Sequence, residues 1–156
     1  MRSIPYQLIL LSLLLVGCAS YPTQELSDAR QALQAAEEAN AAQHAPIHLG
    51  KATKLLSSAE HALAPEKTSY ATARTNALAA KKVAIKAREL SLAFTSTIEE
   101  LKDHALTTPS HNKANKLLQQ AQDAAQAGDG ILAAALVSKA RAVIKKHQTT
   151  GTTQPH

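Results

Sequence analysis

Residues 66–106 read EKTSYATARTNALAAKKVAIKARELSLAFTSTIEELKDHAL, and this stretch decides the fold class. Along it, small or apolar residues recur at steps that alternate between three and four, which is the heptad spacing of a helix that packs one face against its neighbours. The stretch therefore predicts one long helix over about residues 66–106, and its alanine-rich middle would let another helix approach closely. The residues of this predicted packing seam are Tyr70, Ala73, Ala77, Ala80, Ala84, Ala87, Ser91, Phe94, Ile98 and Leu101.

Proline and glycine divide the rest of the chain into shorter predicted helices. Proline is tolerated at the start of a helix but interrupts its interior, so Pro22, Pro46, Pro65 and Pro109 indicate boundaries. We therefore expect an all-α fold of about five helices in antiparallel hairpins, arranged as an elongated bundle or as a short helical-repeat array. Besides the long helix, the predicted helices cover about residues 23–43, 46–63, 113–127 and 131–147.

A short internal repeat supports the hairpin arrangement. Residues 51–62, KATKLLSSAEHA, recur as residues 113–124, KANKLLQQAQDA. Each copy is followed by a break and then by another alanine-spaced helix, as in the hairpins of bundles and helical repeats. Chance similarity between two alanine-rich helices is the alternative explanation.

The first residues have the features of a secretory signal. Arg2 supplies a positive charge, residues 8–16 form an almost unbroken apolar run, and the small residue Gly17 follows that run directly. The run is far shorter than the ~20 residues that a membrane-spanning helix needs. We therefore interpret residues 1–17 as a cleaved signal peptide.

Residues 15–18, Leu-Val-Gly-Cys, resemble the lipobox of bacterial lipoproteins. The resemblance implies cleavage after Gly17 and a covalent lipid on Cys18, which is the only cysteine of the chain. Several acyl chains anchor a protein far more firmly than one. Ala19 and Ser20 follow the cysteine without an aspartate, which by the same resemblance implies the outer membrane. Residues 18–22 would then be anchor and linker, 23–148 the helical domain and 149–156 a flexible tail.

The part of the chain over about residues 22–92 also resembles an uncharacterised family of alanine-rich periplasmic domains. These domains occur alone in small lipoproteins or ahead of OmpA-like peptidoglycan-binding domains. The resemblance implies a periplasm-facing helical module, without the wall anchoring that an appended peptidoglycan-binding domain would supply. It is carried by residues 26–30 (LSDAR), 36–39 (AEEA), 45–46 (AP), 70–88, and Leu55 with Ala59.

The chain is basic, with a formal net charge of +5. Lys81, Lys82, Lys86 and Arg88 form a basic cluster that would suit anionic lipid headgroups, lipopolysaccharide, a glycan or an acidic protein face. A solvated helix face without a dedicated partner is the alternative. Export argues against nucleic acid, and so does the scarcity of aromatic residues for base stacking, with three tyrosines and one phenylalanine.

No pattern of catalytic or metal-binding residues emerges. Of the seven histidines, His44 and His48 have the four-residue spacing of paired ligands, but Pro46 interrupts a helix between them and no third ligand is near. Serine elbows, zinc motifs and phosphate-binding glycine loops are missing. We expect no metal, no small-molecule substrate, no cofactor besides the lipid on Cys18, and no enzymatic activity.

These features predict a structural or adaptor lipoprotein at the periplasmic side of the outer membrane, whose partner is another envelope protein or a second copy. One alternative is an assembly helper for an outer-membrane complex, like the helical lipoproteins that pilot secretins. Another is a binder of anionic lipopolysaccharide or glycan through the basic cluster. The sequence leaves open the partner, the oligomeric state, and the choice between a closed bundle and an open array.

Overall fold

The computed structural model of the chain describes residues 20–103 and 108–151, with the side chains of residues 20–103 and 109–146. Every regular element in these ranges is a helix, which confirms the predicted all-α class. Gly17, Cys18, the signal segment 1–17, the end of the predicted long helix (104–106) and the end of the predicted tail (152–156) lie outside the described residues. The helices are α2 (Thr23–Glu38), α3 (Ala41–His44), α4 (Pro46–His61), α5 (Tyr70–Asp103), α6 (Thr108–Gln126) and α7 (Gly130–Gly151).

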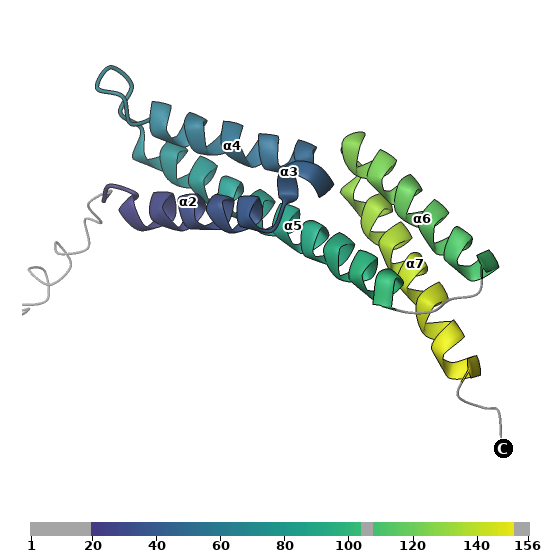
Figure 1. Cartoon of the computed structure of the whole chain (residues 1–156). Coiled ribbons are helices and arrows are strands. Elements are labelled where there is room, and N and C mark those ends of the chain that lie inside the picture. The colour runs from purple at the N-terminus through teal and green to yellow at the C-terminus, as the bar shows by residue number, and fades with distance from the viewer. Residues whose placement is uncertain (1–19, 104–107, 152–156) are drawn as a thin grey trace, which may run out of the picture.

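Helix α5 is shared by two groups of helices and gives the molecule its length. Helices α2 and α4 lie along the first half of α5, and the α6–α7 hairpin lies against its second half (Figure 1). The start of α2 and the C-terminal end of α7 are consequently at opposite ends of an elongated body (Figure 1). Within the described ranges, no helix combines the length and apolarity needed to cross a membrane.

The single helix predicted over residues 23–43 is wrong, because the chain breaks into α2 and α3 at Asn40. Asn40 has a φ of 62°, in the left-handed region that asparagine tolerates better than most residues. The buried Ser91 hydroxyl of α5 donates a hydrogen bond to the carbonyl oxygen of Ala39, directly before the break. A tertiary contact thus satisfies a carbonyl that a continuous helix would have used internally.

Other helix boundaries also differ from the predicted ones. Helix α5 begins at Tyr70 rather than at residue 66, because Ser69 caps it: the Thr72 amide donates to the Ser69 hydroxyl at 3.4 Å. Helix α6 begins earlier than predicted, at Thr108, and accommodates Pro109 in its first turn. Helix α7 continues to Gly151, so that the first residues of the predicted tail are helical.

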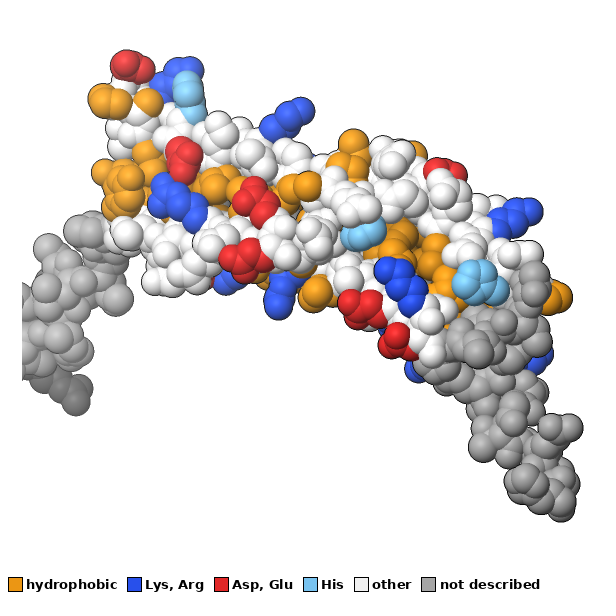
Figure 2. Space-filling view, viewed as in Figure 1, with side chains coloured by type: hydrophobic (Ala, Val, Ile, Leu, Met, Phe, Trp, Pro, Cys, Tyr) orange, Lys and Arg blue, Asp and Glu red, His pale blue; other side chains and the backbone are white. Residues whose placement is uncertain are grey.

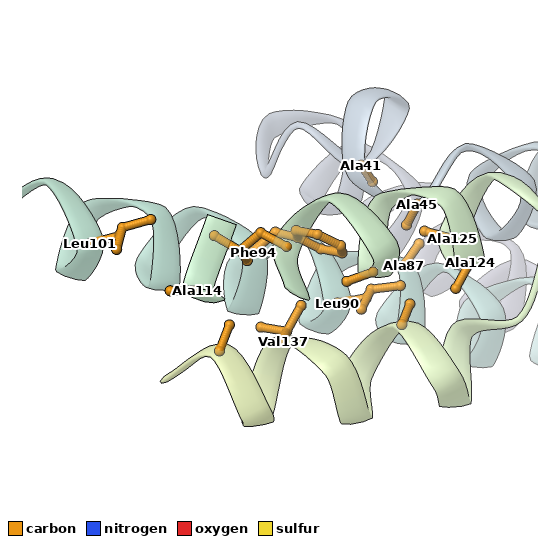
Figure 3. Close-up of a cluster of buried hydrophobic side chains, with 14 of the residues drawn as sticks. Ala41, Ala45, Ala87, Leu90, Phe94, Leu101, Ala114, Ala124, Ala125 and Val137 are labelled. Atoms are coloured by element: carbon orange, nitrogen blue, oxygen red, sulfur yellow. The ribbon is translucent and has the colours of Figure 1, made fainter. Parts of the chain in front are cut away.

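The predicted seam of α5 lies in the interior. Tyr70 and Ile98 are half-buried, and the other members are buried. The buried side chains form two clusters along the helix. The first contains Leu26, Ala29, Leu56, Ala59, Ala77 and Ala80, between α2, α4 and α5. The second joins α5 to α6 and α7 and includes Leu90, Phe94, Leu101, Leu118, Val137 and Ile144 (Figure 3).

The internal repeat is visible as two hairpins, α4–α5 and α6–α7, with the same burial pattern. Leu56 is 8% exposed and its counterpart Leu118 is 9% exposed, while Ala59 and Ala121 are fully buried. The match extends into the second helix of each hairpin, where buried positions follow the same spacing of four, three and four. These positions are Ala73, Ala77, Ala80 and Ala84 in α5, and Ala133, Val137, Ala140 and Ile144 in α7.

Candidate docking surface on the long helix

The predicted basic cluster does not form one continuous face. Lys81 points to α2, where its Nζ lies 2.8 Å from an Asp28 carboxylate oxygen. Lys82, Lys86 and Arg88 are exposed, and among the described residues they form no ion pair. Since successive residues of an α-helix are about 100° apart, Lys82 and Lys86 lie on one side of the outer face of α5, and Lys81 and Arg88 on the other.

Three large apolar side chains occupy the strip between these cations. Leu78 is 49% exposed, Ile85 40% and Leu92 46%. They are seven residues apart, and hence nearly aligned along the helix axis. We call this surface the outer stripe of α5: Leu78, Ile85 and Leu92, with Lys82, Lys86 and Glu89 beside them. It lies on the side of α5 that faces away from the buried seam. The helix therefore has apolar residues on its outer face as well as on its inner one.

The outer stripe is hollowed at two places. A shallow hollow of about 360 Å³ lies on α5 alone, and Leu78, Lys81, Lys82 and Ile85 are among its lining residues. A larger one of about 580 Å³ lies where the α6–α7 turn and α4 meet α5. Lys86 and Glu89 line both hollows, so they form one continuous surface.

The α6–α7 turn forms the far wall of the larger hollow. Gly130 lies directly against His48, where a side chain carbon would be only 2.5 Å from the imidazole Cε1. Ile131 follows at the start of α7 and is 87% exposed. Asp129 is engaged in capping this helix, because its carboxylate accepts a hydrogen bond of 2.9 Å from the Leu132 amide. The wall is thus closely packed at Gly130 and exposes the apolar side chain of Ile131.

Two ion pairs hold α2 on α5 beside the outer stripe. The hydrogen bond from Lys81, followed by that from Gln24, keeps the pKa of Asp28 below its usual range. The pKa of Glu25 is lowered by its own backbone amide and by Arg74, whose Nε lies 2.6 Å from the carboxylate. Both carboxylates therefore remain charged near neutral pH, and they partly neutralise Lys81 and Arg74, whereas Lys82, Lys86 and Arg88 have no such partner among the described residues.

The two histidines considered as metal ligands have other surroundings. His44 is buried and stacks on Phe94, with ring centroids 5.1 Å apart, and its Nδ1 lies 3.2 Å from Gln122 Oε1. His48 packs against Gly130 instead. In the part of the chain that the structure describes, no three His, Cys, Asp or Glu residues are grouped for a metal ion.

His44 lies at the junction between the two halves of the molecule. It contacts Phe94 of α5 and Gln122 of α6, and Gln122 also donates to the Gln43 carbonyl oxygen at 2.6 Å. On the face shown in Figure 2, apolar side chains gather in two groups, one along α2 and α4 and the other where α6 approaches α5. His44 lies between α5 and α6, one helix of each hairpin, and we interpret the residue as a structural one.

Residues 20–22 are held at the first turn of α5. Arg74 Nη2 donates to the Ser20 carbonyl oxygen at 3.0 Å, and the Tyr21 and Tyr70 rings meet edge to face at 5.8 Å. Pro22 is fully buried. Residues 20–22 of the predicted linker are therefore packed on the body, at the end where α2 and α5 begin.

The basic cluster was predicted from the sequence, but the exposed apolar residues between its members were not. Leu78, Ile85 and Leu92 have a clear signal, a spacing of seven, which duplicates the period of the buried seam. The hollow at the α6–α7 turn had no such signal, because His48, Lys86 and Ile131 are far apart in the sequence.

The fold and the surface together define a class of protein: an elongated all-α body of two similar helical hairpins, with an amphipathic outer face on a shared helix. No protein-family model, no curated protein and no solved structure matches the chain.

Proposed function

We propose that this chain is a lipid-anchored envelope protein whose helical body acts as a non-enzymatic adaptor at the periplasmic side of the outer membrane. The observation that carries the adaptor function is the outer stripe of α5, where large apolar side chains remain exposed on a helix that is otherwise well packed. Contiguous exposed apolar surface bordered by charge is typical of interaction sites. The lipobox at residues 15–18 supports the anchor.

The packed linker gives this proposal a definite geometry. Ser20 is held by Arg74 and lies two residues after Cys18, a distance that extended chain spans in about 7 Å. A lipid on Cys18 would therefore keep the end formed by the starts of α2 and α5 next to the membrane. The α7 end would be directed away from it, since it lies at the opposite end of the body (Figure 1).

The anchor is tested by metabolic labelling with a palmitate analogue in a Gram-negative host. We expect the full chain to be labelled and to fractionate with outer membranes, and Cys18→Ser to lose both properties. Ser20→Ala is the matched control, because it alters the same segment but keeps the thiol. Labelling that persists in Cys18→Ser would contradict the proposal.

The orientation is tested with thiol labels, because a lipidated Cys18 leaves the rest of the chain without a thiol. Lys67→Cys places a label in the α4–α5 turn, and Lys145→Cys places one near the end of α7; both lysines are exposed. We expect a quencher carried by the lipids to reduce the fluorescence of the first label far more than that of the second. Equal quenching would contradict an end-on anchor.

The adaptor function is tested by photocrosslinking in cells, from exposed positions on each of the helices α2, α4, α5 and α6. We expect a discrete protein adduct from at least one helix. If no position gives an adduct, the adaptor proposal fails even where lipidation is found. A glycan-binding function through the basic cluster has weaker support, because Lys81 is already paired with Asp28.

A further inference from the structure

The outer stripe of α5 has the geometry with which one helix receives another. In coiled coils, each side chain of one helix inserts into a hole made by four residues of its partner. These residues are related as i, i+3, i+4 and i+7. Leu78, Lys81, Lys82 and Ile85 have this relation, and they line the shallow hollow on α5. The hollow is thus a hole of this type without an occupant from the described part of the chain.

The second hollow continues this surface into a groove. From Leu78 to Ala93, the last α5 residue that lines it, the helix rises about 22 Å at ~1.5 Å per residue. Over the second part of this length Ile131 and Ala134 of α7 add a wall. The apolar residues of α5 in this groove are Leu78 and Ile85 in its first part and Leu90 and Ala93 in its second. A length of about four turns with such a floor and a partial wall suits an amphipathic helix laid along α5.

The charge of the groove determines which kind of helix fits. Lys82, Lys86 and Arg88 are exposed beside the stripe, and Glu89 is the one acidic residue among them. A second copy, aligned antiparallel about Ile85, would place Lys82 opposite Arg88 of that copy. Glu89 would lie opposite Lys81, which is already paired with Asp28. A parallel pair in register would place each cation opposite itself. Like charges in such positions are destabilising, so the surface disfavours self-association and favours an acidic partner.

We propose that the outer stripe of α5 is the docking site of an acidic amphipathic helix of another envelope protein, with its apolar side chains on Leu78, Ile85 and Leu92 and its carboxylates near Lys82 and Lys86. This inference rests on the proposed adaptor function and names the chemistry of the partner. A lipid surface is a poorer fit, because the acidic Glu89 lies directly beside the three apolar side chains and a helix lying in a membrane presents a wider apolar face.

The test uses the full chain and a synthetic peptide of about 16 residues, which spans the groove at ~1.5 Å per residue. The peptide carries leucine at heptad positions a and d and glutamate at the flanking positions. We expect saturable binding by fluorescence anisotropy that weakens as salt is raised. A peptide with lysine in place of glutamate should not bind. Failure of the acidic peptide to bind, or equal binding of both peptides, would overturn the inference.

Two matched variants locate the binding. Lys82→Glu with Lys86→Glu should weaken binding of the acidic peptide about tenfold, since both lose attraction and add repulsion. Lys51→Glu with Lys54→Glu makes the same charge change on exposed residues of α4 and should alter binding less than about twofold. Equal weakening by the two pairs would show non-specific charge attraction and overturn the inference.

Ile85→Ser tests the apolar part of the site. This half-exposed residue contributes little to folding, so helix content by circular dichroism should be unchanged while peptide binding falls. Vesicles of phosphatidylglycerol form the competing arm, and protection of residues 78–92 by vesicles but not by the peptide would assign the surface to the membrane. If lipidation and adducts from other helices are found while the peptide fails, the adaptor function stands and only this site is wrong.

Discussion

The hairpins α4–α5 and α6–α7 bury corresponding positions but fill them with side chains of different size. In α5 the four repeated positions are all alanine, whereas in α7 two of them are Val137 and Ile144. Alanine buries little apolar area, so the first hairpin depends on close approach of its helices, with α2 as a third member. The second hairpin depends on the bulk of its side chains, including Phe94 from α5.

The ion pairs between helices also differ between the two halves of the molecule. Around the first hairpin, three ion pairs connect α2 to its neighbours: Arg30–Glu60 at 2.7 Å, Arg74–Glu25 at 2.6 Å and Lys81–Asp28 at 2.8 Å. In the second half, Arg141 of α7 pairs with Glu100 of α5 at 3.1 Å. The same burial pattern is thus stabilised in one hairpin by close packing of the helices together with ion pairs, and in the other by larger apolar side chains.

The largest effect is expected from Phe94→Ala. Phe94 is 1% exposed, and its loss should lower the free energy of unfolding by about 3–5 kcal/mol, because a cavity remains in the bulkier half. Denaturant unfolding followed by circular dichroism measures this loss, and hydrogen exchange should accelerate mainly in α6 and α7. Leu92→Ala is the control, since Leu92 is half-exposed on the same helix. If Phe94→Ala lowered the free energy of unfolding no more than Leu92→Ala does, the second half would not depend on the bulk of its buried side chains.

A second, smaller effect is expected from enlarging the alanine seam. Ala77→Leu should cost about 1–3 kcal/mol, because the added carbons separate helices that are in close contact. Val137→Leu at the corresponding position of α7 adds a single carbon and should cost less. Ala71→Leu, on the exposed side of α5, controls for the change in composition. Amide hydrogen exchange in α2 should accelerate for Ala77→Leu and not for the other two variants. An equal loss of stability for Ala77→Leu and Val137→Leu would show that the two helices are packed alike at these positions.

Replacing one glycine in each hairpin by alanine should change stability in opposite directions. Gly128 has a φ of 86° in the α6–α7 turn, so Gly128→Ala should cost about 1–2 kcal/mol. Gly50 is in α4 with open space around its Cα, so Gly50→Ala should raise stability by about 0.5–1 kcal/mol. Thermal melts of both variants measure the difference. Stabilisation by Gly128→Ala would contradict the described turn.

The smallest effect is expected from acidification. The pKa values of Glu25 and Asp28 are lowered in the folded chain, so their contribution to stability is present above their unfolded pKa values of about 4 and is lost as the pH falls through the folded values. Exchange in α2 should therefore accelerate below about pH 4 before exchange in α7 does. Glu25→Gln with Asp28→Asn should remove this difference, and Asp123→Asn on α6 should keep it. A pH response that persists in the double variant would assign it to other groups.

Much of the fold could be predicted, because helix formation and the burial of one face have local signals. The seam from Ala73 to Leu101 is an example, since its spacing alone places it on one side of a helix. The break at Asn40 could not be predicted in this way. It depends on the contact between the Ser91 hydroxyl and the Ala39 carbonyl oxygen, two groups that are brought together only by packing of α2 on α5.

The candidate site shows the same division. Lys82, Lys86 and Arg88 were identified from the distribution of charge along the sequence. The apolar residues are harder to assign, because α5 contains two sets with a seven-residue period, the alanine seam and the set of Leu78, Ile85 and Leu92. The period alone does not show which set is buried. Hydrophobicity by itself would place Leu78, Ile85 and Leu92 inside and the alanines outside. The structure has the reverse arrangement, because α2 and α4 approach closely only over small side chains.

The sequence by itself determined the helical class, the alignment of the α5 alanines on one side of a helix, the repeat of residues 51–62 and the basic character of α5, since each follows from local spacing and composition. The proposed anchor rests on the resemblance of residues 15–18 to a lipobox. Only the tertiary structure decided that the α6–α7 hairpin packs against the second half of α5, that His44 contacts Phe94 of α5 and Gln122 of α6, and that Ile131 forms a wall beside the outer stripe. These contacts join residues far apart in the chain, and they depend on how the helix surfaces fit together rather than on any local preference.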